Sequence, residues 1–110
     1  MSQSWPHNEP RQVAPPLSTL VPTMVETLAG FHAYVRFAST DPATNRFRFY
    51  DLRWQPTLFG EGALVRVWGR QGQPGTVRAT VYPDRDHAQA VIRHLVRRRL
   101  AHGYQVREWH

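Results

Sequence analysis

The sequence predicts an α+β domain in which one long helix packs on one face of a single β-sheet. Residues 46–54, 63–70 and 76–82 are rich in β-branched and aromatic residues and are separated by turns that contain glycine or proline, which is typical of strands. Residues 86–101 carry apolar side chains at 88, 91, 92, 95, 96 and 100, and this helical spacing leaves one apolar stripe. A chain of 110 residues has room for one domain at most.

The N-terminal segment 1–28 is expected to be a disordered tail because five prolines interrupt a mostly polar stretch. A short helical turn around 24–28, ending at Gly30, is compatible with the pattern. The domain is expected over 29–107, with a C-terminal tail at 108–110. The first residues lack the basic and apolar regions of a signal peptide, and cysteine is absent, so we expect a cytoplasmic protein.

Two predicted strands surround a turn at 41–45. Apolar residues alternate over 31–38, as in a half-buried strand, and Asp41, Pro42 and Asn45 are typical turn residues. In strand 46–54 the apolar phase changes between Phe49 and Tyr50. Either both faces of this strand are covered, or a β-bulge resets its register.

The loop 55–62 carries two large apolar residues, Leu58 and Phe59, at its centre. Contiguous exposed apolar residues are uncommon, so we favour a plug that tucks onto the core. The alternative is an exposed binding tip.

The stretch 63–70 is the central strand. Side chains alternate along a strand, so Val65 and Val67 point one way, and Leu64, Arg66, Trp68 and Arg70 point the other. In strand 76–82 the inward set is Val77, Ala79 and Val81, whereas Arg78 points outward beside the arginines of the central strand. We expect the helix to cover the valine face, and a short edge strand at 104–106.

Charge is distributed unevenly. The net charge is +6, and all 14 basic residues are arginines. Residues 1–62 carry five arginines and five acids, whereas residues 63–110 carry nine arginines and three acids. The excess indicates either a polyanionic partner or a basic surface without one.

Catalytic and metal-binding patterns are not found. The sequence has no nucleophile motif, no paired acids at a useful spacing and no phosphate-binding glycine loop. His87 and His94 lie on one helix about 10 Å apart, too far to share a metal. No apolar run is long enough to span a membrane. We therefore expect no enzyme activity, no metal and no cofactor.

The uncovered face would gather Trp68 with Arg66, Arg70 and Arg78, and with Arg48 and Tyr50 if the strands pair. One interpretation is a half-buried indole covered by arginine stems. The other is a platform for a sugar-phosphate chain, in which guanidinium groups contact phosphate and rings stack on sugar or base. Such a face would show little sequence specificity and a strong salt dependence.

The chain resembles the WGR domain family, whose motif is seen here as Trp68-Gly69-Arg70. The resemblance extends from about 31 to 106 and includes Asp41-Pro42, the run 45–50, the run 55–60 and residues 97–104. It implies a twisted antiparallel sheet with one packed helix. In poly(ADP-ribose) polymerases the domain binds near DNA breaks. Carried over, Trp68 packs on sugar at a 5′ end, and Arg70 links DNA to neighbouring domains. The resemblance also implies that the DNA backbone is contacted by Asn45, Arg46 and Arg48.

The sequence departs from the family pattern in three respects. Gln71 replaces the usual apolar residue, and Gly62 stands where bacterial relatives often carry tryptophan, which would leave that region less supported. No ADP-ribosyltransferase domain fits in this length. The function expected is a non-catalytic module that binds DNA ends or single strands with low specificity. The alternative is an adaptor that docks a protein partner through the same face or through the Leu58-Phe59 loop.

Overall fold

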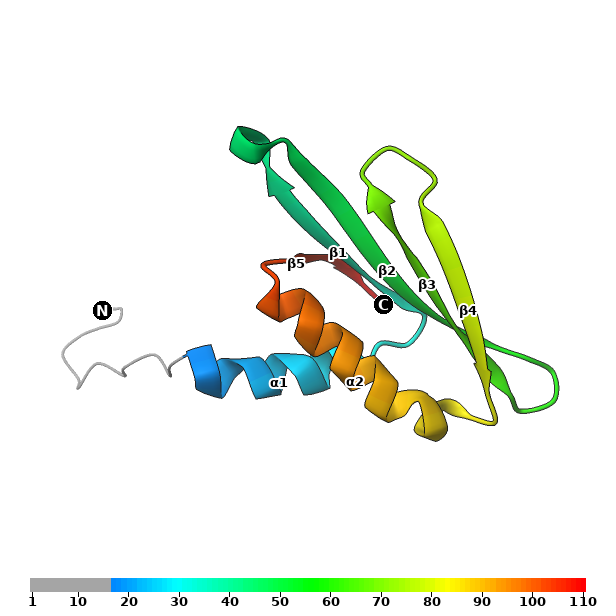
Figure 1. The fold of residues 1–110 in the computed structure, drawn as a ribbon. Coiled ribbons are helices and arrows are strands. Elements are labelled where there is room, and N and C mark those ends of the chain that lie inside the picture. The colour runs from blue at the N-terminus through cyan, green and yellow to red at the C-terminus, as the bar shows by residue number, and fades with distance from the viewer. Residues whose placement is uncertain (1–16) are drawn as a thin grey trace, which may run out of the picture.

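Five strands form one antiparallel sheet in the computed structural model, which describes residues 17–110 (Figure 1). The strand order is β4-β3-β2-β1-β5. The strands are β1 (Tyr34–Asp41), β2 (Arg46–Pro56), β3 (Gly62–Arg70), β4 (Thr76–Tyr82) and β5 (Gln105–Trp109). The predicted α+β fold with one antiparallel sheet and a long C-terminal helix is confirmed. β5 extends through residues expected to form a C-terminal tail, because they pair with β1.

The turn between β1 and β2 uses the predicted chemistry. A short 3-10 helix, η1 (Pro42–Thr44), is capped by Asp41, whose carboxylate accepts from the Ala43 amide at 3.1 Å. Asn45 closes the turn in the left-handed region at φ 55°, which asparagine tolerates well.

β2 contains no bulge. It pairs without interruption with β1 and with β3. Phe49 and Asp51 are buried on one face of the sheet, and Tyr50 and Leu52 are buried on the other. Of the two alternatives for the phase change, coverage of both faces is the correct one.

Two helices cover one face of the sheet (Figure 1). The predicted helix is α2 (Arg85–Ala101), and Asp84 caps it by accepting from the His87 amide at 2.9 Å. α1 (Leu17–Ala29) packs against α2 and buries Val25, Leu28 and Ala29. The prediction of an irregular tail is therefore wrong for residues 17–28. Pro22 disfavours a helix locally, but burial of the C-terminal half outweighs that cost. The remainder of the predicted tail, residues 1–16, lies outside the described residues.

The helices cover the opposite face from the one predicted. Residues paired across strands point to the same face, and Tyr50 pairs with Trp68 whereas Trp54 pairs with Leu64. Leu64 and Tyr50 belong to the core beneath the helices. We call this the helix face. It contains Val35, Phe37, Tyr50, Leu52, Leu64, Arg66 and Trp68.

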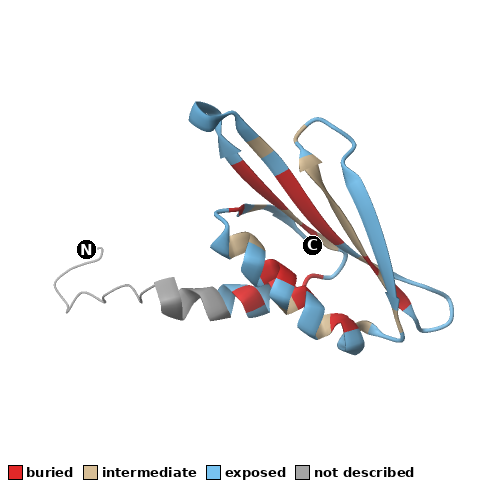
Figure 2. Cartoon of the chain, viewed as in Figure 1, coloured by how far each residue is buried: buried red, intermediate tan, exposed pale blue. Residues whose placement is uncertain are grey.

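The valines lie on the other side, which we call the open face. Val77 and Val81 are each 63 % exposed there. Most of β4 has the colour of exposed residues in Figure 2. The prediction that the helix seals the valine face is wrong. Large side chains of β1 and β2, such as Phe37 and Leu52, fix the buried side, and the register of β3 follows theirs. Val91 also departs from the predicted stripe, being 37 % exposed.

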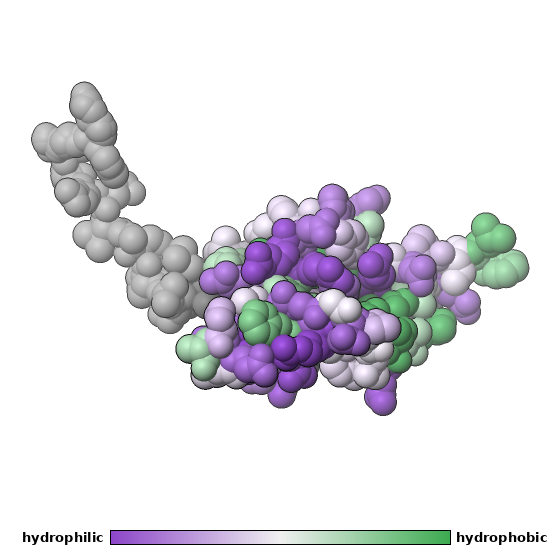
Figure 3. Space-filling view, turned by 90° about the horizontal axis from the view of Figure 1, so that it is seen from above, coloured by the Kyte–Doolittle hydropathy of each residue, from purple (hydrophilic) through white to green (hydrophobic). Residues whose placement is uncertain are grey.

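The loop between β2 and β3 projects into solvent. Leu58 is 97 % and Phe59 87 % exposed, so the favoured plug is wrong and the exposed tip is correct. Hydrophobic residues project at this end of the molecule (Figure 3). At the base of the loop, a Cβ at Gly62 would overlap the Trp54 indole. The Trp54 indole therefore occupies the space beside Gly62, where bacterial relatives often carry a tryptophan.

Candidate nucleic-acid interface

Trp68 lies on the helix face near the end of β3, at the margin of the core. It is half-buried and packs against the core cluster. Its indole stacks with the Tyr50 ring at 6.1 Å and an interplanar angle of 23°. The Arg66 guanidinium lies 5.8 Å from the indole centre. One part of the indole therefore contributes to stability, while the remainder is accessible.

Behind Tyr50, Arg99 of α2 continues the stack. Its guanidinium carbon lies 4.3 Å from the Tyr50 ring centre and 5.2 Å from that of Tyr104. The Arg99 Nε is buried and has no hydrogen-bond partner among residues 17–110. Arg99 thus lies between the Tyr104 and Tyr50 rings, Tyr50 stacks with Trp68, and Arg66 lies over the indole. Each contact between an arginine and a ring contributes a modest cation–π attraction.

Four arginines of the helix face form two cross-strand pairs. Arg48 lies opposite Arg70, and Arg66 lies opposite Arg78. We call these four residues the arginine cluster. Like charges directly opposite one another destabilise a sheet. The ion pairs of the described chain that involve arginine use Arg36, Arg53 and Arg93, so no carboxylate neutralises the cluster there.

The β1–β2 turn holds one member of the cluster in place. Arg70 donates to the Asn45 backbone oxygen at 3.4 Å and to its side-chain Oδ1 at 3.2 Å. Its guanidinium also lies 5.2 Å from the Phe47 ring centre. Arg46 turns instead toward Ser39, to which its Nε donates at 2.7 Å, and toward Tyr104. The structure therefore brings Asn45 to the cluster and sets Arg46 apart from it.

Gly69 has a packing role. It pairs with Phe49 on β2, and a Cβ at Gly69 would lie 3.0 Å from the Cα of Gly75 and 3.7 Å from the Phe49 ring. Gly75 adopts φ +84°, and a Cβ there would come within 2.7 Å of the Trp68 carbonyl oxygen. These two glycines allow the β3–β4 turn to close over Phe49 on the open face. Of the predicted site residues, Gly69 thus has a packing role between Trp68 and Arg70.

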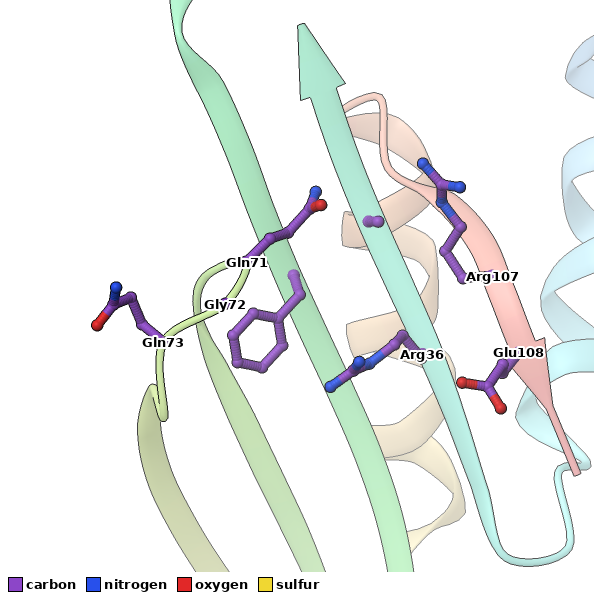
Figure 4. A pocket seen from close by; sticks show the side chains of 8 residues that line it. Arg36, Gln71, Gly72, Gln73, Arg107 and Glu108 are labelled. Carbon is purple, nitrogen blue, oxygen red and sulfur yellow. The ribbon is translucent and has the colours of Figure 1, made fainter. Parts of the chain in front are cut away.

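The sequence did not reveal a pocket of about 510 Å³ on the open face (Figure 4). Arg36 and Glu108 flank it from neighbouring strands, and the turn 71–73 borders it on another side. The lining residues are Arg36, Ala38, Phe49, Gln71, Gly72, Gln73, Arg107 and Glu108. Gln71, the departure from the family pattern, donates through Nε2 to Thr40 Oγ1 at 2.9 Å and to the Arg48 carbonyl at 3.1 Å.

Arg36, which lines this pocket, forms a half-buried ion pair with Asp51. Arg36 Nε and Nη2 donate to the two Asp51 oxygens at 2.8 and 2.9 Å, and Asp51 is only 2 % exposed. The hydrogen bonds to Asp51 raise the pKa of Arg36. Tyr34 donates to Glu108 at 2.7 Å, and this bond lowers the pKa of Glu108. Arg36 and Asp51 lie equally far from the β1–β2 turn and pair across the hairpin. The sequence could therefore have indicated their pairing if a symmetric hairpin had been assumed for these strands.

Among residues 17–110, no group of three or more histidine or acidic side chains is arranged to hold a metal ion. None of the helices described there is long and apolar enough to cross a membrane.

The chain matches the WGR domain family over residues 34–109. It is also 33% identical over 67 residues to an uncharacterized protein, y4dW, of Sinorhizobium fredii (strain NBRC 101917 / NGR234), with 61% of this chain and 33% of that protein aligned. The chain thus spans about a third of the length of that relative. No solved structure matches. The family match covers all five strands, α2 and the motif Trp68-Gly69-Arg70, and this chain belongs to the WGR domain family.

Proposed function

We propose that this chain is a non-catalytic module that binds DNA ends or single strands, with low sequence specificity, through the arginine cluster and Trp68. The observation that carries the proposal is the two pairs of directly opposed arginines, Arg48 with Arg70 and Arg66 with Arg78. Such pairs lower the stability of the free domain, and a bound phosphate chain would remove that cost. WGR domains of poly(ADP-ribose) polymerases bind near DNA breaks, which supports the same conclusion.

The Trp68 indole offers a stacking surface for a base or sugar, which the arginines that contact phosphate do not provide. Base or sugar stacking on an aromatic side chain contributes about 1–3 kcal/mol per base and tolerates any sequence. Trp68 is held flat against Tyr50 and is thereby preorganised. A base must be unstacked or terminal to reach it, so single strands and duplex ends fit this face better than a continuous duplex does.

Fluorescence anisotropy tests the proposal with four labelled probes: a single strand, a blunt duplex, a nicked duplex with a 5′ phosphate, and a closed dumbbell without ends. We expect the dumbbell to bind most weakly. If the four arginines each neutralise one phosphate, log K should fall with log salt at a slope of about −3 for the single strand. Equal affinity for the dumbbell and the ended duplexes contradicts end preference.

The residues are tested with a charge-matched pair of variants. Arg66→Gln combined with Arg78→Gln should weaken single-strand binding at least about tenfold and make the salt slope shallower by about 1.5. The control combines Arg97→Gln with Arg98→Gln. Those side chains are exposed on α2, and the control removes the same charge from outside the face. Equal losses in both variants would mean that net charge alone attracts the DNA.

A second function is favoured by one observation, the exposure of Leu58 and Phe59. Two adjacent apolar side chains at a loop tip are suited to insertion into a groove of a protein partner. Replacing both with serine should leave DNA binding and stability unchanged while removing capture of that partner in nuclease-treated extract. DNA binding that falls with this variant would assign the tip to the nucleic-acid site instead.

A further inference from the structure

β4 is an edge strand with an uncovered outer side. It pairs with β3, and no other described strand lies beyond it (Figure 1). Its first six residues are exposed and Tyr82 is half-buried, so neither face of the strand is covered (Figure 2). Edge strands are usually protected by charged side chains, especially lysine, by proline or by a bulge. β4 has no proline or lysine, its pairing with β3 is regular, and its one charged side chain, Arg78, lies on the helix face. Its outer backbone groups are therefore a template for another strand.

We infer that β4 pairs with β4 of a second copy of this chain, antiparallel, about a two-fold axis at Ala79. The strand sequence is self-complementary in this register. Val77 of one copy falls opposite Val81 of the other, and the same contact repeats across the axis. Both valines are on the open face and 63 % exposed, so pairing covers four exposed valines at once. Val65 and Val67 of β3 lie beside them on that face.

Avoidance of a direct contact between like charges selects the same register. With the axis at Ala79, Arg78 falls opposite Thr80 of the second copy, and no guanidinium directly faces another across the new boundary. An axis at Arg78 would place the two Arg78 guanidinium groups opposite each other and would offset the valines. In the view of Figure 3, hydrophobic residues gather toward one end of the molecule, whereas polar residues cover most of the rest.

The size of the contact sets its strength. Pairing over seven residues buries less than the roughly 1,200 Å² of a standard stable interface. Each copy also carries a net charge of +6, which opposes association at low ionic strength. We therefore expect a weak dimer that strengthens as salt rises. DNA binding through phosphate contacts changes with salt in the opposite direction, so the two activities can be separated experimentally.

The axis is perpendicular to the sheet, so both copies present their helix faces on the same side. Arg66 and Arg78 of the two copies would then lie along one continuous sheet. If the proposed DNA contact is correct, a dimer offers one strand a longer basic surface. The dimer itself does not depend on that function.

The absence of cysteine makes cross-linking a specific test. In the proposed register the two Ala79 Cα atoms are about 4.5–5.5 Å apart, within disulfide range. Ala79→Cys should therefore form an intermolecular disulfide under mild oxidation in high salt, at least about tenfold faster than two control variants. In Thr76→Cys the two thiols would be separated by about 20 Å. Ala90→Cys places an exposed thiol on α2. Equal rates in all three variants overturn the inference.

Sedimentation velocity of the unmodified chain supplies an independent measurement. Between about 10 µM and about 1 mM, the range for a small interface, the mean mass should rise toward that of a dimer. Val81→Lys should remove this rise, because it sets an ammonium group opposite Val77, and it should not unfold the domain since Val81 is largely exposed. A monomer over the whole range at high salt, or a Val81→Lys variant that still dimerises, overturns the proposal.

Discussion

Reversing the charge at position 78 separates the stability of this domain from its proposed function. Arg78 is exposed on β4 and lies directly opposite Arg66. Arg78→Glu replaces a like-charged pair with an opposite-charged one on the same face. If the opposed arginines serve DNA binding at a cost in stability, this variant should make the folded domain more stable and DNA binding weaker.

The expected magnitude follows from the exposure of the pair. A cross-strand charge pair contributes roughly 0.2–1 kcal/mol, and a like-charged pair costs a similar amount. Replacing a like-charged pair with an opposite-charged one adds the two contributions. Because the pair is exposed to solvent, we expect the free energy of unfolding to rise by only about 0.5–1 kcal/mol. For a domain of this size that raises Tm by about 2–8 °C. DNA affinity should fall roughly tenfold or more, and the salt slope should become shallower by at least about 1.

Thermal unfolding at low salt and anisotropy with a single-stranded probe measure the two effects. Protein concentrations in the low micromolar range keep the chain monomeric. Arg97→Glu is the control, since it makes the same charge change on the exposed side of α2. Loss of stability in Arg78→Glu, or unchanged DNA binding beside a control that weakens it, would refute the idea that the domain sacrifices stability to hold these arginines together.

Three further predictions concern single contacts. Trp68→Leu keeps an apolar contact with the Tyr50 ring, so it should lower stability by only about 1–2 kcal/mol while weakening single-strand binding roughly 5- to 150-fold; wild-type affinity in a folded variant would reduce the indole to a packing role. Asp51→Asn leaves Arg36 facing a neutral amide. Because the Arg36 side chain is 41% exposed, we expect the free energy of unfolding, measured in urea, to fall by about 1–3 kcal/mol. An unchanged free energy of unfolding would mean that the ion pair does not stabilise the domain. His87 Nδ1 lies 2.7 Å from Asp84 Oδ1, and this contact raises the pKa of His87 above its ordinary 6.5. Its contribution to stability is complete below pH 6.5 and is lost as the pH rises through the raised value. The Tm difference between the wild type and His87→Gln should therefore shrink toward alkaline pH, and a constant difference would exclude the interaction.

The sequence by itself determined the strands of the sheet and the long C-terminal helix, but not α1. Alternation in strands, the apolar stripe over 86–101 and the turn residues 41–45 are local patterns set by backbone geometry, and the structure retains each of them. The grouping of Arg66 and Trp68 on one face also followed from alternation, because residues two apart must point the same way.

Only the tertiary structure decided which face is buried. Alternation distinguishes Val65 and Val67 from Leu64 and Trp68 but does not say which set meets the helix. That choice came from the register with β1 and β2, whose larger side chains bury more surface. The direct opposition of arginines, the Arg36–Asp51 pair and the packing of α1 likewise depend on residues far apart in the chain. Local patterns cannot contain such information, because it arises only when separate elements come into contact.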